Sequence, residues 1–390
     1  MRKWKRAFLG EGVCLALLAA GCGGGVAHAE PVVLAPKGGG ALLPVKVDAA
    51  EGRILLTLPA PDSDGVAGRY LYSPSIKTGL GSAPVRIDRG MQGETKVLAF
   101  RKMGRKVAVL FENPRYRASG AAAVQKGAVG SFPFSIMAMV DIVATAPGGG
   151  LTIDITPFLT SDTMNLAQTL NTDGKGYRLS DKLSALDLSA TRLFPENLEM
   201  EAVQTFVSDN PGKEVDTIAP DGRQVSFTVH HSLIKLPEPG FVPRKFDIRS
   251  GTHATQIYDF GTPLGDPVLV QLANRFRLEK TDPSAARSPV KKPIVFYIDT
   301  AAPEPIRTAL ADGVGWWNQA FEAAGFIDAF QVKMLPPDAD PQDVRYNVVN
   351  WVDRQNRSWS FGSGVIDPRT GEIVKGLVVL GALRVRQDIT

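Results

Sequence analysis

The stretch Lys292–Phe326, KPIVFYIDTAAPEPIRTALADGVGWWNQAFEAAGF, joins two different apolar patterns. The continuous apolar run Ile294–Ile298 is typical of a strand that is buried on both faces. Further along, an apolar residue recurs at every third or fourth position, at Ile306, Leu310, Val314, Trp317, Phe321 and Ala324. This spacing predicts a helix over Pro303–Ala324, ended by Gly325, and we expect its apolar stripe to pack in a core.

Four further strands are predicted after this helix. Phe330–Leu335 and Arg345–Val352 are short apolar runs. Gly364–Ile366 and Glu372–Leu380 flank the turn sequence Asp367–Gly371, which predicts a hairpin. The order strand, helix and four strands indicates an α/β domain.

A boundary precedes this domain. Residues 281–293 contain three prolines among small and charged residues, a composition that extends neither a strand nor a helix and therefore predicts a linker. We assign residues 286–390 to the α/β domain and residues 52–285 to a mainly β domain. Residues 30–51, rich in Ala, Gly, Pro and Val, are expected to form a flexible lead-in.

The mainly β domain is predicted from alternation and turns. Lys96–Arg101 and Lys106–Glu112 flank the turn sequence Lys102–Arg105, and Glu199–Val207 is expected to pair with Gln224–Leu236. A period of two places one set of side chains on the same face of this last strand: Val225, Phe227, Val229, His231 and Leu233. The fold class is therefore α+β.

Residues 1–29 have the features of an export signal. A basic start and the apolar run Val13–Ala20 precede a small-residue pattern that predicts cleavage between Ala29 and Glu30. An alternative is a lipoprotein signal, in which Cys22 is acylated and becomes the first mature residue. Both alternatives place the protein outside the cytoplasm, in the periplasm or cell envelope.

Charge and cysteine content exclude several classes of function. The formal net charge is +4, most of it from the basic start, and no stripe of Lys and Arg suggests nucleic-acid binding. The two cysteines, Cys14 and Cys22, both lie in the predicted signal, so no disulfide is expected in the mature protein. Membrane attachment is expected only through lipidated Cys22.

No motif predicts a catalytic or metal-binding residue. The four histidines do not form H-E-x-x-H, and His230 and His231 are adjacent on a predicted strand, so their side chains should point to opposite faces. Packing or surface hydrogen bonding is therefore the preferred interpretation for His231 and His253. The sequence also lacks a phosphate loop and a G-x-S-x-G motif.

Several ordered segments resemble a known family. The segment WNQAFEAAGF at 317–326, with DVRYNVVNWV at 343–352 and DPRTGEIVKGLVVL at 367–380, resembles the first half of the peptidase domain of bacterial met-zincin-like zinc-dependent metallopeptidases. GLGSAPVRIDRG at 79–90, FPENLEME at 194–201 and LPEPGFVPRKFDIRSG at 236–251 resemble the uncharacterised domain that precedes it.

This resemblance implies peptide-bond hydrolysis by zinc-activated water in the full-length form. The zinc would be held by an H-E-x-x-H helix, a motif that residues 1–390 do not contain, so we expect no cofactor in this chain and leave open whether the chain is an enzyme. The family binds peptide or protein substrate along an edge strand, which would correspond here to Val374, Lys375, Gly376, Leu377, Val378, Val379 and Leu380. The alternative function is that of a non-enzymatic envelope protein that binds a partner through its β domain.

Overall fold

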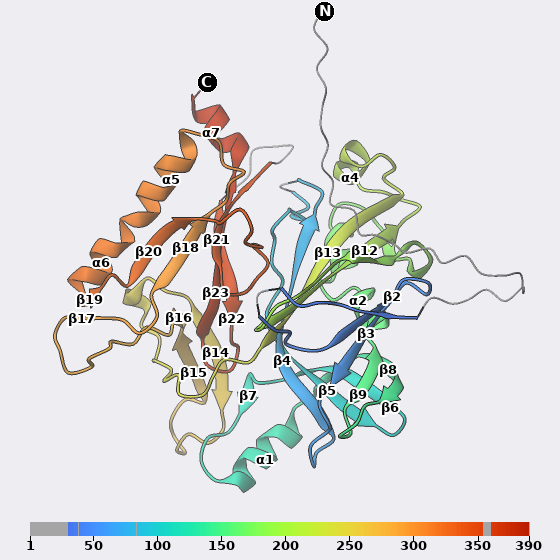
Figure 1. The fold of residues 1–390 in the computed structure, drawn as a ribbon, viewed down its shortest axis with the longest axis horizontal. Helices are drawn as coiled ribbons and strands as arrows, with labels where there is room; N and C mark the ends of the chain where they lie inside the picture. Colours follow the sequence, from blue (N-terminus) through green and yellow to red (C-terminus); the bar gives the residue numbers. More distant parts are fainter. Residues whose placement is uncertain (1–29, 38, 83, 354–359, 390) are drawn as a thin grey trace, which may run out of the picture.

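The computed structural model describes residues 30–37, 39–82, 84–353 and 360–389. It is mainly β, as the sequence predicts, with two large sheets side by side and a small three-stranded sheet near their lower ends (Figure 1). The predicted signal residues Cys22 and Ala29 lie outside the described part of the chain, which begins at the exposed Glu30.

The first sheet has twelve strands, and all of its pairs are antiparallel. Its order is β1-β2-β3-β9-β8-β6-β5-β4-β13-β12-β10, with β11 also paired to β12. The strands are β1 (Val32–Val33), β2 (Val45–Asp48), β3 (Arg53–Leu58), β4 (Val66–Thr78), β5 (Lys96–Met103), β6 (Lys106–Glu112), β8 (Ser135–Thr145), β9 (Leu151–Asp154), β10 (Arg178–Leu179), β11 (Ala185–Leu193), β12 (Asn197–Val207) and β13 (Gln224–Lys235).

This sheet curls until its two ends approach each other. The backbone N–H groups of Lys37 and Leu42 donate to the carbonyl oxygens of Leu193 and Phe194, at 2.8 Å in both cases. A large apolar core fills the curl and includes Leu43 and Val45, which are almost completely buried. The prediction of a flexible lead-in over residues 30–51 is therefore wrong, because β2 and its apolar residues complete the sheet and its core.

Both predicted hairpins of this region are confirmed. The β5–β6 turn contains Gly104 at φ +63°, a conformation that glycine adopts without steric cost. β12 and β13 pair without interruption over eleven residues, from Asn197↔Ile234 to Val207↔Gln224. Short helices lie beside the sheet, α2 (Thr156–Leu159), α3 (Leu166–Leu170) and α4 (Lys213–Ile218), whereas α1 (Ala122–Ser131) packs beside β7 (Tyr116–Arg117). A second apolar cluster that includes Phe206 and Phe227 packs α3 and α4 against β12 and β13.

The second sheet has six strands. Five are connected in the order β16-β23-β21-β18-β20, and β22 pairs with the edge of β23 that β21 leaves open. All of its pairs are parallel except β22 with β23. The elements are β16 (Arg275–Phe276), β18 (Ile294–Ile298), α5 (Ile306–Gly315), α6 (Trp317–Ala323), β20 (Phe330–Met334), β21 (Asn347–Val352), β22 (Phe361–Ile366), β23 (Glu372–Gly381) and α7 (Ala382–Ile389). The predicted strand, helix and four strands are thus present.

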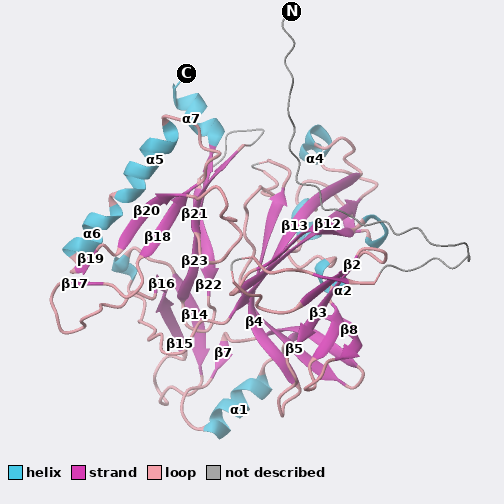
Figure 2. Cartoon of the chain, viewed as in Figure 1, coloured by secondary structure: helices cyan, strands magenta, loops and turns pink. Residues whose placement is uncertain are grey.

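The helices of this part lie on one side only. α5 and α6 lie along the outer side of the six-stranded sheet, away from the first sheet (Figure 2). The predicted single helix is divided at Trp316, and neither part has a buried residue. Phe321 stacks on Phe330, with ring centroids 5.6 Å apart, but Trp317 is 62% exposed. The prediction that the stripe packs in a core is therefore wrong, because Ile306, Leu310, Val314 and Phe321 are only half-buried and Trp317 is exposed.

The remaining short strands connect the two sheets. β7 (Tyr116–Arg117), β14 (Ala254–Asp259) and β15 (Leu269–Ala273) form the three-stranded sheet, and β17 (Ser288–Pro289) pairs with β19 (Phe326–Ile327). β16 lies before the predicted boundary near residue 285 but pairs with β23. The chain therefore enters the second sheet earlier than the linker composition predicts. Among the helices that the structure describes, none is both long and apolar enough to cross a membrane.

Candidate functional site

β22 forms one edge of the six-stranded sheet, and β20 forms the opposite edge. β23 pairs with β21 from Leu377 to Gly381 on one side and with β22 from Ile373 to Val379 on the other. The predicted substrate-edge strand, Val374–Leu380, is therefore internal, and the prediction of its edge position is wrong. In the β22–β23 hairpin, β22 (Phe361–Ile366) lies outside β23. On its outer side β22 has no strand partner among the described residues.

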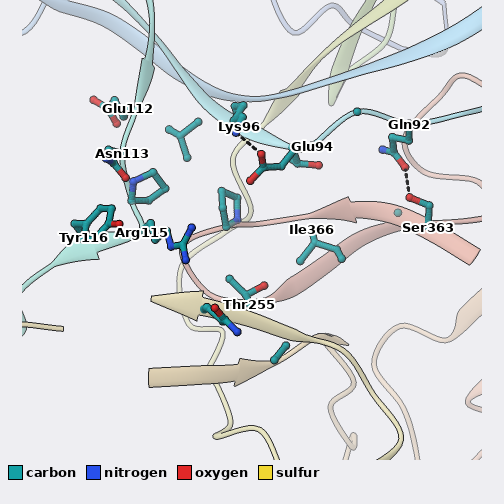
Figure 3. Close-up of a pocket in the computed structure, with 18 residues that line it drawn as sticks. Gln92, Glu94, Lys96, Glu112, Asn113, Arg115, Tyr116, Thr255, Ser363 and Ile366 are labelled. Carbon is teal, nitrogen blue, oxygen red and sulfur yellow. Dashed lines mark hydrogen bonds and ion pairs between the residues drawn. The ribbon is translucent and has the colours of Figure 1, made fainter. Parts of the chain in front are cut away.

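The outer edge of β22 faces a groove. The groove has a volume of about 800 Å³, and β22 contributes Ser363, Gly364 and Ile366 to one wall. The opposite wall is the segment Gln92–Val97, which leads into β5 (Figure 3). Ser363 Oγ donates to Gln92 Oε1 at 3.1 Å, so the two walls are in contact at one end.

A second open strand edge faces the same groove. β14 pairs with β15 over Ala254–Tyr258, but on its other side it pairs with β7 only at Tyr258 and Asp259. The edge of Ala254, Thr255 and Gln256 on this side has no strand partner in the described chain, and these residues line the groove. The groove therefore offers unpaired backbone N–H and C=O groups on two walls, which an extended chain could pair with.

The charged side chains of the groove are paired, with one exception. Glu94 is bonded to Lys96, and Glu112 Oε1 accepts from Arg69 Nε at 2.8 Å. Arg115 is exposed, and no carboxylate of the described chain lies within 4.0 Å of its guanidinium nitrogens. Its guanidinium carbon lies 5.5 Å from the ring centroid of Tyr258 and 6.0 Å from that of Tyr116.

Stacked aromatic rings support Arg115. Tyr116 lies between Tyr258 and Phe132, with ring centroids 5.1 Å and 4.2 Å away and interplanar angles of 12° and 14°. Phe132 in turn stacks on Phe260 at 5.4 Å. The Tyr258 N–H donates to the Arg115 carbonyl at 2.7 Å, which holds this backbone beside β14. Figure 3 shows Arg115 next to Tyr116 at one end of the groove, with Gln92 and Ser363 at the other.

A buried polar cluster lies between the two sheets, and we call it the interface cluster. It consists of Asn197, Glu199, Glu201, His230 and Ser232 of the first sheet, with Gln342 from the segment before β21. Gln342 Nε2 donates to Glu201 Oε1 at 3.1 Å and lies 3.1 Å from His230 Nδ1. Asn197 Oδ1 accepts from the Val344 N–H at 3.2 Å. The cluster therefore joins the two sheets by hydrogen bonds that are buried at Asn197 and partly buried at Gln342.

His230 is the cation of the interface cluster. Its Nε2 is bonded to Glu199, and its Nδ1 lies 3.5 Å from Glu201 Oε1. Burial disfavours the charged imidazole, but the two carboxylates outweigh burial and raise the pKa of His230 to about 9. Glu201 is also buried, yet its bonds to His230 and Lys77 lower its pKa to about 2.

His231 has the opposite environment, as the strand alternation predicts. Its Nδ1 lies 2.7 Å from the Tyr72 hydroxyl, inside the core of the first sheet. Burial and the neighbouring His230 charge lower the pKa of His231 to about 3. His231 is therefore neutral at neutral pH, whereas His230 is charged.

The side chains present do not fit a catalytic zinc ion. Among the described residues, no group of three or more His, Cys, Asp or Glu side chains could hold a metal ion. His230 is engaged by two carboxylates on one face of β13 and His231 by Tyr72 on the other.

Sequence reasoning missed both β22 and Arg115 as site residues. One signal for β22 was available, because Phe361–Ile366, FGSGVI, contains none of the charged or proline residues that usually protect an edge strand. No local signal distinguishes Arg115 from other arginines, because its lack of a carboxylate partner depends on contacts between distant segments.

One family model matches the chain. It is described as a domain of unknown function (DUF5117) and matches residues 90–281, slightly less than half of the chain. The match includes the groove residues Gln92–Val97 and Glu112–Tyr116 and the open edge of β14, but not β22. No curated protein and no solved structure gives a match.

Proposed function

We propose that this chain is the amino-terminal portion of an exported, zinc-dependent metallopeptidase-like protein, and that it does not hydrolyse peptides by itself. The observation that carries this proposal is the antiparallel edge strand β22, which lies open along a groove beside a mainly parallel sheet with a helical β18–β20 crossover. It agrees with the resemblance of residues 317–380 to the first half of the peptidase domain. The model match at residues 90–281 falls on the part that resembles the uncharacterised preceding domain.

The groove would hold the substrate as an added strand. β22 has two glycines and a serine at its centre, so its backbone is sterically accessible from outside. An extended peptide that pairs with β22 gains backbone hydrogen bonds without requiring a particular sequence. The zinc ligands and the general base would come from residues beyond those in this chain, since the side chains here do not fit the metal.

Peptide binding by residues 30–390 tests the proposal. We expect fluorescein-labelled eight-residue peptides to bind saturably in fluorescence anisotropy, without stoichiometric zinc in elemental analysis and without cleavage. Consecutive strand residues point their N–H groups to opposite sides, so either Gly362→Pro or Ser363→Pro removes an outward-facing donor. One of these two variants should lose peptide binding while it keeps the circular dichroism spectrum of the wild type. Absence of peptide binding by the wild type, or zinc-dependent cleavage, would contradict the proposal.

Export is a separate part of the proposal. In a Gram-negative host the protein should be found in the envelope with Glu30 as its first residue, or with a lipid on Cys22. Soluble cytoplasmic protein that retains residues 1–29, identified by mass spectrometry, would contradict export.

A second candidate function is that of a non-enzymatic envelope protein that binds a partner through its β domain. Exposed apolar side chains on and beside β8 favour it: Phe134, Ile136, Met139 and Val143 are each at least 40% exposed. Exposed apolar groups in a row are typical of contact surfaces. If this function is correct, Ile136→Lys should abolish capture of an envelope partner, whereas the proline variants of β22 should not.

A further inference from the structure

We infer that the groove selects peptides with an acidic side chain, and that Arg115 is the residue that binds it. This inference rests on the proposed function and concerns the same groove. It assigns substrate selection to a residue outside the peptidase-like part, in the segment before β7.

The charges in the groove support an acidic ligand. Of the four charged residues that line it, Glu94 and Lys96 neutralise each other, and Glu112 is neutralised by Arg69. Arg115 is left with aromatic contacts alone, as far as the described chain shows. A peptide carboxylate would gain an uncompensated positive partner, whereas a lysine side chain would meet carboxylates that are already occupied.

The orientation of Arg115 also favours a carboxylate. A guanidinium group close to an aromatic ring keeps its N–H donors available at its edge, in the geometry that binds both oxygens of a carboxylate. The Tyr258–Tyr116–Phe132 stack and the backbone bond between Arg115 and Tyr258 fix the rings and the backbone beside the guanidinium. Little backbone freedom would therefore be lost when the ligand binds.

The two open edges bring a peptide side chain to Arg115. A peptide strand paired with β22 would lie in the groove. Residues of β14 and Arg115 also line this groove, so side chains of the peptide could reach Arg115. Peptide side chains alternate in direction, so only certain positions of the peptide can face Arg115. We therefore expect the acidic preference to be limited to one or two positions.

A positional scan tests this inference. Eight-residue labelled peptides carry a single Glu at each position in turn, with Gln at the same position as the neutral control. At one or two positions Glu should bind residues 30–390 about fivefold more tightly than Gln, as expected for one partly exposed ion pair. Arg115→Gln should abolish this difference and leave the affinity for the Gln peptides unchanged. Arg115→Glu should favour Lys at the same positions.

The matched control is Arg105→Gln, an exposed arginine in the β5–β6 turn outside the groove, which should keep the preference for Glu. Equal affinity of the wild type for Glu and Gln peptides at every position would overturn the inference, as would a preference for Glu that survives in Arg115→Gln. In either case the proposed function would stand if the peptides still bind and a proline in β22 still blocks them. No binding of either series would overturn both.

Discussion

The first sheet and the helices α5 and α6 both have regular apolar patterning, but they differ in how far that patterning is covered. In the first sheet, alternate residues of β13 such as Phe227 and Val229 are almost completely buried in a common core. On α5 and α6 an equally regular stripe has no buried residue, and Trp316 and Trp317 are 72% and 62% exposed. Periodicity thus shows which side chains share a face, but it does not show whether another layer covers that face.

The largest change in unfolding free energy is expected in the buried core of the first sheet. Phe227 is 1% exposed and lies 6.1 Å from Phe206 between ring centroids. Phe227→Ala should lower the free energy of unfolding by ~3–5 kcal/mol, because it removes buried apolar area and leaves a cavity. Urea denaturation followed by circular dichroism measures this, and a loss below about 1 kcal/mol would show that Phe227 is no better packed than the side chains of α5 and α6.

The next effect concerns the contact between the two sheets. His230 has a folded-state pKa of about 9, above its unfolded value, so its stabilising contribution is complete below about pH 6.5 and is lost as the pH rises through 9. This shift corresponds to about 3 kcal/mol. The difference in unfolding free energy between wild type and His230→Gln should therefore shrink as the pH rises from 7 to 10.

His231 makes this pH test specific. Its folded-state pKa of about 3 lies below the unfolded value, so its effect on the pH dependence of stability falls below about pH 7, and it contributes little change from pH 7 to pH 10. A wild-type-minus-variant difference that stays constant across the range would contradict a charged His230 in the interface cluster.

A smaller loss in unfolding free energy is expected on substitution of Gln342, which lies beside His230 in the segment before β21. Gln342→Ala removes the hydrogen bond from Gln342 Nε2 to Glu201 Oε1 but leaves the ion pairs of His230 intact. We expect a loss of about 1 kcal/mol in unfolding free energy. A loss as large as that of His230→Gln would mean that the contact between the sheets, rather than the ion pairs, supplies most of the stability of the interface cluster.

The smallest effect is expected at the exposed helices. Trp317→Ala should change the unfolding free energy by less than ~0.5 kcal/mol, because its side chain already contacts water. Phe321→Ala is the matched comparison. Because Phe321 stacks on Phe330, this substitution should lower the free energy of unfolding by more than Trp317→Ala does. A cost of several kcal/mol for Trp317→Ala would show that a further layer covers the helices in solution.

The sequence alone determined features that depend on neighbouring residues. Strand alternation places His230 and His231 on opposite faces, and turn residues define the hairpins β5–β6 and β22–β23, because these patterns follow from local backbone geometry. Only the tertiary structure decided that β2 completes the first sheet, that β22 rather than β23 is the open edge, that Trp317 is exposed and that Arg115 lacks a carboxylate partner. Each of these depends on which distant segments come together, and burial, edge exposure and charge pairing are properties of those contacts rather than of the local sequence.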